Sequence, residues 1–396
     1  MEEYKMKWEK RAHEYDDIAK KITREENKFY IWGWGIVGKT FYEKFQGSIN
    51  FIGIIDKNEE KWGEQCDNLS VISPDRVKLG KNEKIVITTG WVNEVKNTLE
   101  NQGYKYREDF FLIDEFSSIY EFYVHDNLHL ENVAIVCNEK CTLRCEKCVS
   151  LIPYNKHQIN YSFDEMCKSS DLLFNWVDSI GILALGGGDV ILNPHLSKFI
   201  DYLGKKYIRR IGRIELYMNA IILPSTDLIE LCKKYNIVIR FTDYSQNVPG
   251  VQRISEILEL CKNNEICCEH VKFANWVDTG YPQESNGITS DNDLIAHCQK
   301  CSPVICSTVI HNKLFYCSPS AMAFASGLFE EDRNDYFDLE DFSQGKRSEL
   351  LEFYNGYSAI GYPSYCKRCN GLFNTNKNLI EVAVQLRNKI NENSNF

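Results

Sequence analysis

The chain runs Val133-Ala-Ile-Val-Cys-Asn-Glu-Lys-Cys141-Thr-Leu-Arg-Cys145-Glu-Lys-Cys148, a short apolar segment followed by a loop with three cysteines. The apolar segment predicts a buried strand. Three thiolates at this spacing can bind three irons of a [4Fe–4S] cluster and leave the fourth iron open. A structural zinc site takes four protein ligands, and no fourth Cys or His completes this loop. Disulfides need an oxidising compartment, of which the sequence shows no sign.

Composition and charge exclude several classes of partner. The chain has 396 residues, a net charge of −10 and a pI near 5.5, which argues against nucleic acid as the main partner. No apolar run approaches the roughly 18 residues that a membrane helix needs. Residues 1–21 are charged throughout, unlike a secretory signal. We therefore expect a cytoplasmic protein without a membrane partner.

A regular alternation of strand and helix patterns begins at the quoted stretch. Candidate strands cover 133–136, 182–185, 214–218, 237–241 and 270–273, with helical patterns at 163–176, 195–207, 227–235 and 254–261. Repeats of this length predict an α/β fold with a parallel sheet, here a partial (β/α)6 barrel over residues 130–280. The cysteine loop follows the first strand, so we expect it at the carboxyl ends of the strands.

A second, smaller alternation precedes the first. We predict one charged helix over residues 1–27 and a small, doubly wound Rossmann-like domain over residues 28–118. Within that domain the spacing Gly33-x-Gly35-x-x-Gly38 follows a strand and opens a helix, and Asp56 ends the next strand. This context suits a dinucleotide fingerprint. Three interpretations stay open: a site for a nucleotide or nucleotide-sugar substrate, a purely structural domain, and an NAD site.

The segments that follow the cysteine loop resemble those of the radical S-adenosylmethionine (radical SAM) enzymes. Gly187, Gly188 and Asp189 are similar to that family's Gly-Gly-Glu-Pro segment, which holds the methionine amino group. Asn219 stands at the family's Thr-Asn-Gly position, and Thr242 and Asp243 stand where a polar residue contacts the ribose. Two positions depart from the family pattern: Lys147 replaces an aromatic residue, and Val190 replaces the proline.

The resemblance implies a reaction and its cofactors. Cys141, Cys145 and Cys148 would bind a [4Fe–4S] cluster whose open iron takes S-adenosylmethionine (AdoMet). Reductive cleavage of AdoMet would give a 5′-deoxyadenosyl radical that abstracts hydrogen from the substrate. The electron would come from a reducing partner such as flavodoxin or ferredoxin.

A second group of cysteines lies in the last quarter of the chain. Residues 281–396 resemble the twitch or SPASM extension of radical SAM enzymes, which binds an auxiliary [4Fe–4S] cluster. The resemblance implies that its ligands are Cys301, Cys317, Cys366 and Cys369, with Cys298 or Cys306 as possible replacements for one of them. Asn312 would form the left-handed turn of a hairpin. The alternative is a structural zinc site, because two Cys-x-x-Cys pairs suit zinc equally well.

The substrate is inferred from the resemblance alone. We expect a small polyhydroxylated molecule, a sugar or nucleotide-linked sugar, that an oxidoreductase or epimerase dehydrogenates or epimerises. For an epimerase, Cys267 or Cys268 would donate hydrogen to the far face of the substrate, although core packing is the favoured explanation of both. The alternatives are a maturase of ribosomal peptides and, in a different class, a non-catalytic iron–sulfur sensor or scaffold.

Overall fold

The computed structural model describes residues 15–301, 307–356, 360–372 and 376–386. Contacts divide these residues into two compact units, with the boundary between His129 and Leu130. The described residues up to His129 form the N-terminal unit, and those from Leu130 onward form the C-terminal unit.

The N-terminal unit contains a six-stranded sheet in the order β3-β4-β2-β1-β5-β6. Its strands are β1 (Lys28–Trp32), β2 (Phe51–Ile55), β3 (Gln65–Cys66), β4 (Leu69–Ile72), β5 (Glu83–Ile87) and β6 (Phe110–Leu112). All neighbours are parallel except β3 and β4. The central strands are apolar because both faces are covered: Ile31, Ile54 and Ile85 are fully buried.

Four helices accompany this sheet: α1 (Asp16–Ile22), α2 (Ile36–Phe45), α3 (Val92–Asn101) and α4 (Ile113–His125). The helix predicted over residues 1–27 is much shorter where the structure describes it, because α1 ends at Ile22 and Thr23 caps it. Residues 1–14 lie outside the described residues. The sequence analysis did not anticipate β3, β4 or α4.

The C-terminal unit is built on an eight-stranded sheet in the order β11-β10-β9-β8-β7-β13-β14-β15. The strands are β7 (His129–Asn138), β8 (Ser179–Gly187), β9 (Ile211–Met218), β10 (Val238–Asp243), β11 (Cys268–Lys272), β13 (Ser307–Ile310), β14 (Lys313–Phe315) and β15 (Tyr336–Asp338). The pairs β8–β9, β9–β10, β10–β11 and β7–β13 are parallel, whereas β14 runs antiparallel to both of its neighbours. The α/β class is confirmed, and the sheet is mixed.

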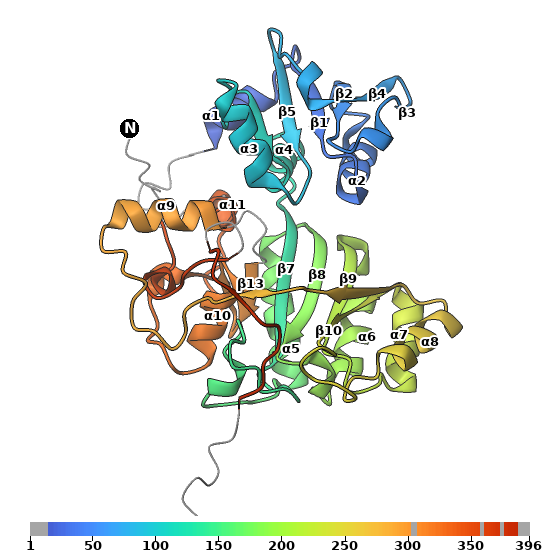
Figure 1. The fold of residues 1–396 in the computed structure, drawn as a ribbon, viewed down its shortest axis with the longest axis vertical. Helices are drawn as coiled ribbons and strands as arrows, with labels where there is room; N and C mark the ends of the chain where they lie inside the picture. The colour runs from blue at the N-terminus through green and yellow to red at the C-terminus, as the bar shows by residue number, and fades with distance from the viewer. Residues whose placement is uncertain (1–14, 302–306, 357–359, 373–375, 387–396) are drawn as a thin grey trace, which may run out of the picture. The chain divides into compact units, whose positions relative to one another are not determined.

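Helices follow the strands as the alternation predicted. They are α5 (Phe163–Trp176), α6 (Leu196–Tyr207), α7 (Thr226–Tyr235) and α8 (Ile254–Asn263), and α6 packs against both α5 and α7. Helix α5 begins at a capping box in which Ser162 and Glu165 exchange hydrogen bonds. Leu196, Phe199, Ile200 and Leu203 of α6 recur at helical spacing and are buried. Figure 1 shows these helices grouped together beside β8, β9 and β10.

The remaining elements come from the C-terminal part of the chain. They are β12 (Trp276–Val277), α9 (Asp291–Cys301), α10 (Ser318–Ala325), α11 (Arg347–Tyr354) and β16 (Leu379–Ile380), and β12 pairs with β16. Short 3-10 helices are η2 (Glu59–Lys61), η3 (Pro74–Arg76), η4 (Ile152–Tyr154), η5 (Val190–Leu192), η6 (Ile208–Arg210), η7 (Arg333–Asp335), η8 (Gln344–Lys346) and η9 (Ser364–Lys367). Among the residues described, no helix is both long and apolar enough to cross a bilayer.

The hairpin predicted around Asn312 is present, and it extends the large sheet. His311 and Asn312 both have positive φ angles, 49° and 61°, as the tight turn between β13 and β14 requires. Strand β13 pairs with β7 in register from Ser307 opposite Val133 to Val309 opposite Ile135. The sheet therefore continues across the boundary that the sequence analysis placed at residue 280.

Candidate functional site

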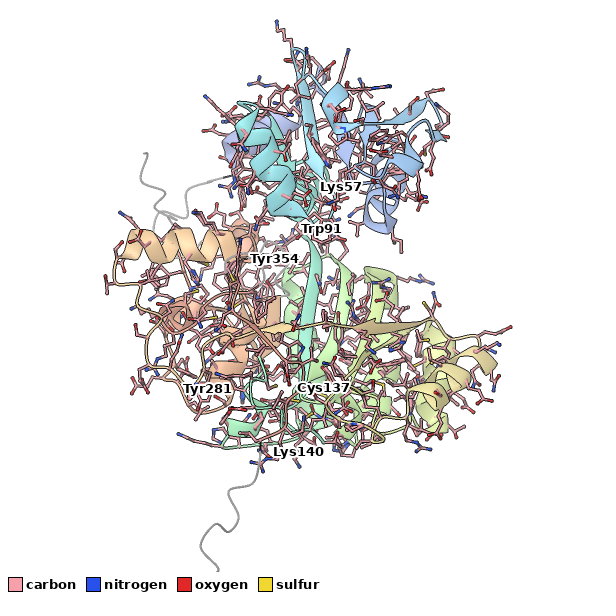
Figure 2. The ribbon with its side chains drawn as sticks, viewed as in Figure 1. Lys57, Trp91, Cys137, Lys140, Tyr281 and Tyr354 are labelled. Atoms are coloured by element: carbon pink, nitrogen blue, oxygen red, sulfur yellow. The ribbon has the colours of Figure 1, made fainter. Side chains whose placement is uncertain are left out.

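The three cysteines of the loop after β7 contact one apolar cluster. Cys145 is buried in it beside Leu143, Val248, Val382 and Ala383, and Cys141 and Cys148 pack against it together with Ile221, Tyr244 and Trp276. Cys137 and Lys140 mark the carboxyl end of β7, where the loop begins (Figure 2). Burial raises the pKa of Cys141 to about 11 and that of Cys145 to about 12. Such thiols give up their protons to a partner that binds the thiolate.

Nitrogen donors contact the sulfur atoms of Cys141 and Cys145. The backbone N–H of Leu143 donates to Cys141 Sγ at 3.4 Å. Asn219 Nδ2 lies 3.5 Å from the same sulfur and donates to Thr142 Oγ1 at 2.7 Å. Gln385 Nε2 donates to Cys145 Sγ at 3.2 Å. Hydrogen bonds of this kind stabilise thiolate ligands, and they place Asn219 at the cysteine loop.

The glycine turn after β8 packs directly on the start of the cysteine loop. Asp189 N donates to Lys140 O at 2.7 Å, and Asn138 Nδ2 donates to Asp189 O at 2.7 Å. A Cβ on Gly187, whose φ is +132°, would lie 2.0 Å from Asn138 O, and one on Gly188 would lie 2.0 Å from Lys140 O. These two glycines are therefore required by the close approach of two backbone segments.

Asp189 carries a buried carboxylate with no partner. Its side chain is fully buried, and neither carboxylate oxygen accepts a hydrogen bond from the described residues. Burial raises the pKa of Asp189 to about 6, and the nearby backbone N–H groups of Ile191 and Asn219 offset this only in part, because neither reaches hydrogen-bond geometry with the carboxylate. Leaving such a group unsatisfied costs about 1–3 kcal/mol, which calls for an explanation.

Gln252 ties together the carboxyl ends of β9 and β10. Its Nε2 donates to Asn219 O at 2.6 Å and to Thr242 O at 2.7 Å, and its Oε1 accepts from Tyr244 N. Gln252 thus holds Thr242 and Asn219 beside each other at the carboxyl ends of these two strands. The ring of Tyr244 meets the ring of Trp276 edge to face at 5.7 Å, and both pack against the cysteine cluster.

Asp243 is engaged elsewhere. Its carboxylate lies 3.4 Å from both His270 Nε2 and Lys272 Nζ and accepts from Ser245 N at 2.8 Å. Burial opposes its ionisation, but the bonds from Ser245 and the charge of Lys272 hold its pKa at about 2. Because neighbouring strand residues point to opposite faces, Asp243 is turned away from the face that Thr242 presents.

The structure does not bring Cys267 and Cys268 to the other candidate residues. Cys268 opens β11 and Cys267 is exposed just before it. Both thiols therefore lie at the amino end of this strand, whereas Thr242 lies near the carboxyl end of β10, which runs parallel to it. A hydrogen donor would have to stand close to the cysteine loop, so this placement gives the two thiols no such role.

The face of the sheet shared by Glu215, Tyr217 and Arg240 is polar. Arg240 Nη1 lies 3.6 Å from Glu215 Oε2 and 3.3 Å from Glu269 Oε2, and Tyr217 donates to Glu215 at 2.9 Å. Arg213 also pairs with Glu215. The arginines are thus already matched by carboxylates. Beyond the strands, Asp278 pairs with Lys147 at 3.0 Å.

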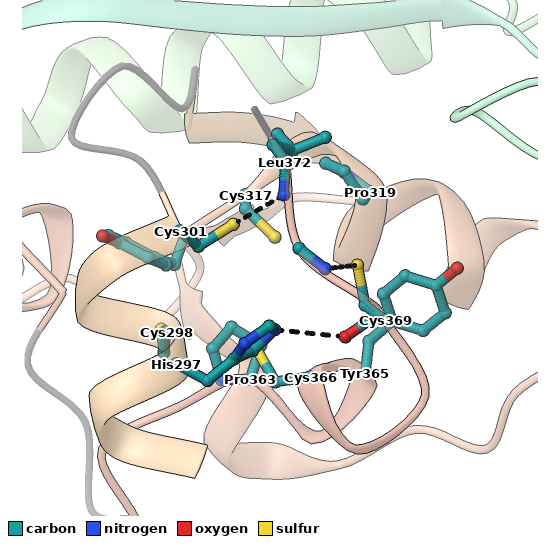
Figure 3. A pocket seen from close by; sticks show the side chains of 12 residues that line it. His297, Cys298, Cys301, Cys317, Pro319, Pro363, Tyr365, Cys366, Cys369 and Leu372 are labelled. Carbon is teal, nitrogen blue, oxygen red and sulfur yellow. Dashed lines mark hydrogen bonds between the residues drawn. The ribbon is translucent and has the colours of Figure 1, made fainter. Parts of the chain in front are cut away.

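Five cysteines from three regions of the chain line a second cavity, shown in Figure 3. They come from α9, from the residue before α10 and from the η9 region, and they are Cys298, Cys301, Cys317, Cys366 and Cys369. The backbone N–H groups of Leu372 and Gly371 donate to Cys301 Sγ at 3.2 Å and Cys369 Sγ at 3.3 Å. Burial raises the pKa of Cys317, and that of Cys369 to about 12.

This cavity contains all four cysteines predicted as the auxiliary set. Cys298 lines it as well and packs beside Cys366, whereas Cys306 lies outside the described residues. Within the described ranges, no group of three or more His, Cys, Asp or Glu side chains is spaced to hold a single metal ion.

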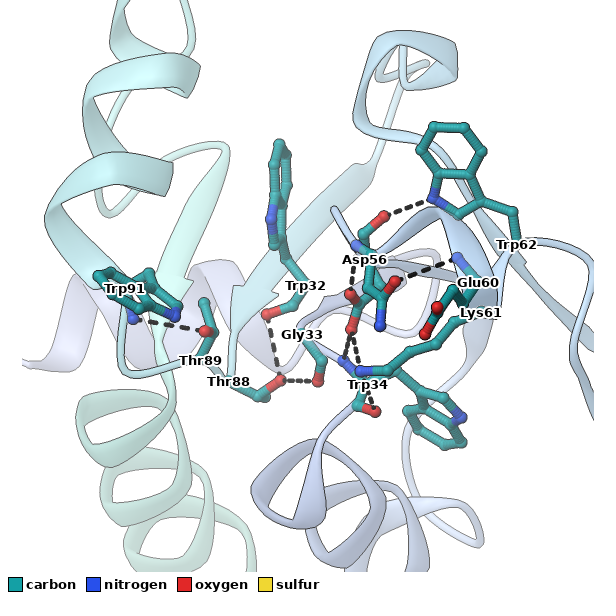
Figure 4. Close-up of polar contacts among 11 residues, drawn as sticks. Trp32, Gly33, Trp34, Asp56, Glu60, Lys61, Trp62, Thr88, Thr89 and Trp91 are labelled. Carbon is teal, nitrogen blue, oxygen red and sulfur yellow. Dashed lines mark hydrogen bonds and ion pairs between the residues drawn. The ribbon is translucent and has the colours of Figure 1, made fainter. Parts of the chain in front are cut away.

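In the N-terminal unit the predicted fingerprint is an internally bonded turn. A Cβ on Gly38 would lie 2.0 Å from Gly33 O, so that glycine lets α2 approach the turn. Asp56 accepts from Trp34 N at 2.7 Å, from Asn58 N at 2.8 Å and from Lys61 Nζ at 2.9 Å (Figure 4). Burial opposes its ionisation, but these bonds outweigh that effect and lower its pKa. Gly35 is the open position, with nothing near a Cβ placed there.

Comparison with known proteins gives one family match and several structural neighbours. Residues 25–108 match the family model described as C2185-like, N-terminal. None of the curated proteins matches the sequence. The family match does not reach the large sheet or the cysteine regions, so the roles of their residues rest on the structure.

Among solved structures, the chain is similar to proteins that bind AdoMet. BtrN in complex with AdoMet and 2-DOIA has a TM-score of 0.42 and 14% identity, covering 61% of this chain and 94% of BtrN. The anSMEcpe structure with bound AdoMet has a TM-score of 0.40 and 9% identity, covering 61% and 89%. Streptococcus suis SuiB bound to S-adenosylmethionine has a TM-score of 0.29 and 11% identity, covering 61% and 67%. At these scores the function has to be argued from the chain's own residues.

Several residues of the site were missed from the sequence. Gln385 and Gln252 stand far along the chain from the cysteine loop, in segments without a recognisable motif, and only folding brings them there. Thr142 lies inside the cysteine loop, but its hydrogen bond with Asn219 joins residues 77 positions apart and could not be predicted locally.

Proposed function

We propose that the chain is a radical SAM enzyme whose cysteine loop holds a [4Fe–4S] cluster and whose sheet edge binds AdoMet. The observation that carries this proposal is the buried, unpartnered carboxylate of Asp189 beside the cysteine loop. An ammonium group is the natural partner for such a carboxylate, and AdoMet carries one next to the atoms that a cluster would bind.

The residues fit a cluster of this kind. Cys141, Cys145 and Cys148 pack against the same apolar cluster, and N–H donors point at two of their sulfurs. Each thiolate of a [4Fe–4S] site binds its own iron, so the three sulfurs need not converge on one point. When bound, the cluster would supply the electron for reductive cleavage of AdoMet.

The surrounding side chains would hold and shield AdoMet. Asp189 would accept a hydrogen bond from the amino group of AdoMet, and Gln252 would keep Asn219 and Thr242 at the same edge. Tyr244 and Trp276 would cover the loop with apolar surface and exclude water. Gly187 and Gly188 would contribute by letting the turn that carries Asp189 lie against the loop.

For the second cavity we propose an auxiliary [4Fe–4S] cluster held by Cys301, Cys317, Cys366 and Cys369. Four thiols from three regions of the chain support this assignment; three of the cysteines are buried, Cys366 is partly buried, and two of the sulfurs accept from backbone N–H donors. Four thiolates also form a common type of zinc site, although the described side chains are not spaced to hold a single metal ion. Only the cluster contains acid-labile sulfide, so a sulfide assay on anaerobically purified Cys141→Ala/Cys145→Ala/Cys148→Ala protein, which lacks the cluster of the loop, distinguishes the two.

We further propose that the substrate is a small polyhydroxylated molecule, oxidised or epimerised at one carbon. The support is the hydrogen-bonding face of Glu215, Tyr217 and Arg240, whose charges are balanced by Arg213 and Glu269. A face with balanced charges suits neutral hydroxyl groups better than a phosphate. Nucleotide binding by the N-terminal unit is a separate proposal, supported by the open space at Gly35. A flavodoxin or ferredoxin would supply the electron.

The decisive experiment is an anaerobic assay for 5′-deoxyadenosine. The reconstituted protein is reduced in the presence of AdoMet, and we expect the nucleoside to form in wild type and in the Cys137→Ala control. Cys137 is buried in β7, four positions before Cys141, and is not one of the predicted cluster ligands. An intact cluster with no nucleoside formed would contradict the proposal and favour a non-catalytic iron–sulfur protein.

A further inference from the structure

The last described segment of the chain returns to the cysteine loop. Residues 382–386, called the strap below, form a short antiparallel contact in which Cys145 and Gln385 are bridge partners. Glu146 N donates to Val384 O at 2.7 Å, and Leu386 N donates to Arg144 O at 2.7 Å. Asn247 Nδ2 donates to Val382 O at 2.6 Å. Figure 1 shows this red segment running to the carboxyl end of β7.

The amide of Gln385 is fully bonded and its orientation is fixed. Its Oε1 accepts from Arg144 N at 2.8 Å. Its Nε2 donates to Ala383 O at 2.7 Å and to Cys145 Sγ at 3.2 Å. The side chain is half-buried, and Ala383 takes a positive φ of 54° where the strap turns toward the loop. No other orientation of the amide satisfies Arg144 N and points an N–H at the sulfur.

We propose that Gln385 is a positioning residue that sets the reduction potential of the cluster in the cysteine loop. The inference rests on the proposed function, because it assumes that Cys145 is a cluster ligand. An N–H donor withdraws charge from the ligand sulfur and so favours the reduced, more negative cluster. The hydrogen bond from Gln385 therefore raises the potential and eases the first electron transfer.

The residues upstream of the strap, between it and the second cavity, make further hydrogen bonds. Asn376 Nδ2 donates to Asp278 O at 2.6 Å, and Asn370 N donates to Thr279 O at 2.9 Å, one residue after Cys369. Asp278 in turn pairs with Lys147 of the cysteine loop. The peptide that leaves the second cavity is thus anchored at both ends of its course, and Gln385 is held in place by more than its own contacts.

Two substitutions separate the donor from the rest of the strap. Gln385→Glu keeps an acceptor for Arg144 N and replaces the donating nitrogen with an anionic oxygen. Gln385→Leu removes the donor without adding charge. Val384→Ala is the matched control, because Val384 is exposed and contacts the loop through its backbone oxygen.

The readout is a redox titration of the cluster followed by electron paramagnetic resonance in the Cys366→Ala/Cys369→Ala background, with iron counted in every sample. We expect both Gln385 variants to shift the midpoint to more negative potential, glutamate further than leucine, and the control to match the parent. An unchanged midpoint in a leucine variant with full iron would overturn the inference, as would loss of iron from both Gln385 variants. A parent that binds no cluster would instead refute the proposed function.

Discussion

The two cysteine regions of the C-terminal unit are built in opposite ways. The cysteine loop collects Cys141, Cys145 and Cys148 from one short segment, and a buried carboxylate without a partner lies beside it. The second cavity collects its thiols from elements far apart in the chain, between Cys298 and Cys369, and has more thiols than a four-iron cluster can bind.

This difference indicates different tasks. A site with fewer protein ligands than irons leaves room for an exogenous ligand, and the neighbouring Asp189 suits a cationic one. A site with a full ligand set holds its metal centre closed and ties several elements together. We therefore expect damage at the loop to abolish chemistry and damage at the cavity to affect metal content and stability first.

The largest effect is expected for Cys145→Ala. Loss of this ligand removes the first cluster, so formation of 5′-deoxyadenosine should fall to background while the second centre keeps its iron. The assay is the anaerobic one described above, with Cys137→Ala as control. Substantial nucleoside formation by Cys145→Ala would show that the loop does not hold the reactive centre.

The converse change is the Cys366→Ala/Cys369→Ala variant. It should lose about half of the iron, roughly four atoms per chain, and still form 5′-deoxyadenosine. It should also unfold at a lower temperature, because the metal centre binds only the folded state. Iron and sulfide counts with a thermal melt check both statements, and loss of all iron would mean that the two centres are not independent.

For Asp189→Asn we expect two smaller effects: weaker AdoMet binding and a more stable ligand-free protein. Loss of a charge-assisted hydrogen bond should weaken AdoMet binding by about 10–100-fold. Without AdoMet the same change should stabilise the fold at pH 7, because the carboxyl with a pKa of about 6 must ionise while buried. The shift of about two units corresponds to roughly 3 kcal/mol at most.

The direction of the stability change in Asp189→Asn follows from how the stability of the wild type depends on pH. The folded pKa of Asp189 lies above its ordinary value of 3.8, so the stability this group provides is complete below about pH 4 and is lost as the pH rises through about 6. Urea unfolding of the ligand-free protein between pH 4 and 7 should show this loss in wild type and not in Asp189→Asn. Equal slopes in the two proteins would contradict the assignment.

The smallest effect is expected at the link between the two regions. Lys147→Met breaks a partly exposed ion pair with Asp278, and such pairs contribute about 0–1 kcal/mol. We expect a change of that size in urea unfolding and no loss of iron. A double-mutant cycle with Asp278→Asn isolates the pair, and a coupling well above this range would indicate a larger structural role.

The sequence predicted best what depends on neighbouring residues. The strand, the cysteine loop and the turn through Gly187 and Gly188 lie within short segments, and their hydrogen-bonding and steric requirements can be recognised locally. The turn at Asn312 was predictable for the same reason, since few residues accept a positive φ angle there.

What depends on folding was missed or left open. Asp243 lies at the end of β10, and the alternation of apolar and polar residues did not predict which face of the strand its side chain occupies. The contact between Gln385 and Cys145 joins residues 240 positions apart. The presence of Cys298 in the second cavity, beside the four predicted thiols, follows from the packing of α9.

The parallel pairing of β13 with β7 has a consequence for how the protein can be dissected. If the chain were cut after residue 280, β7 would lose β13, one of its two neighbours, and the backbone groups that pair with β13 between Val133 and Ile135 would be exposed. Such an exposed edge invites pairing with other molecules and aggregation. The cysteine loop should therefore be studied in the whole chain, because β13, which lies beyond residue 280, covers part of the edge of β7.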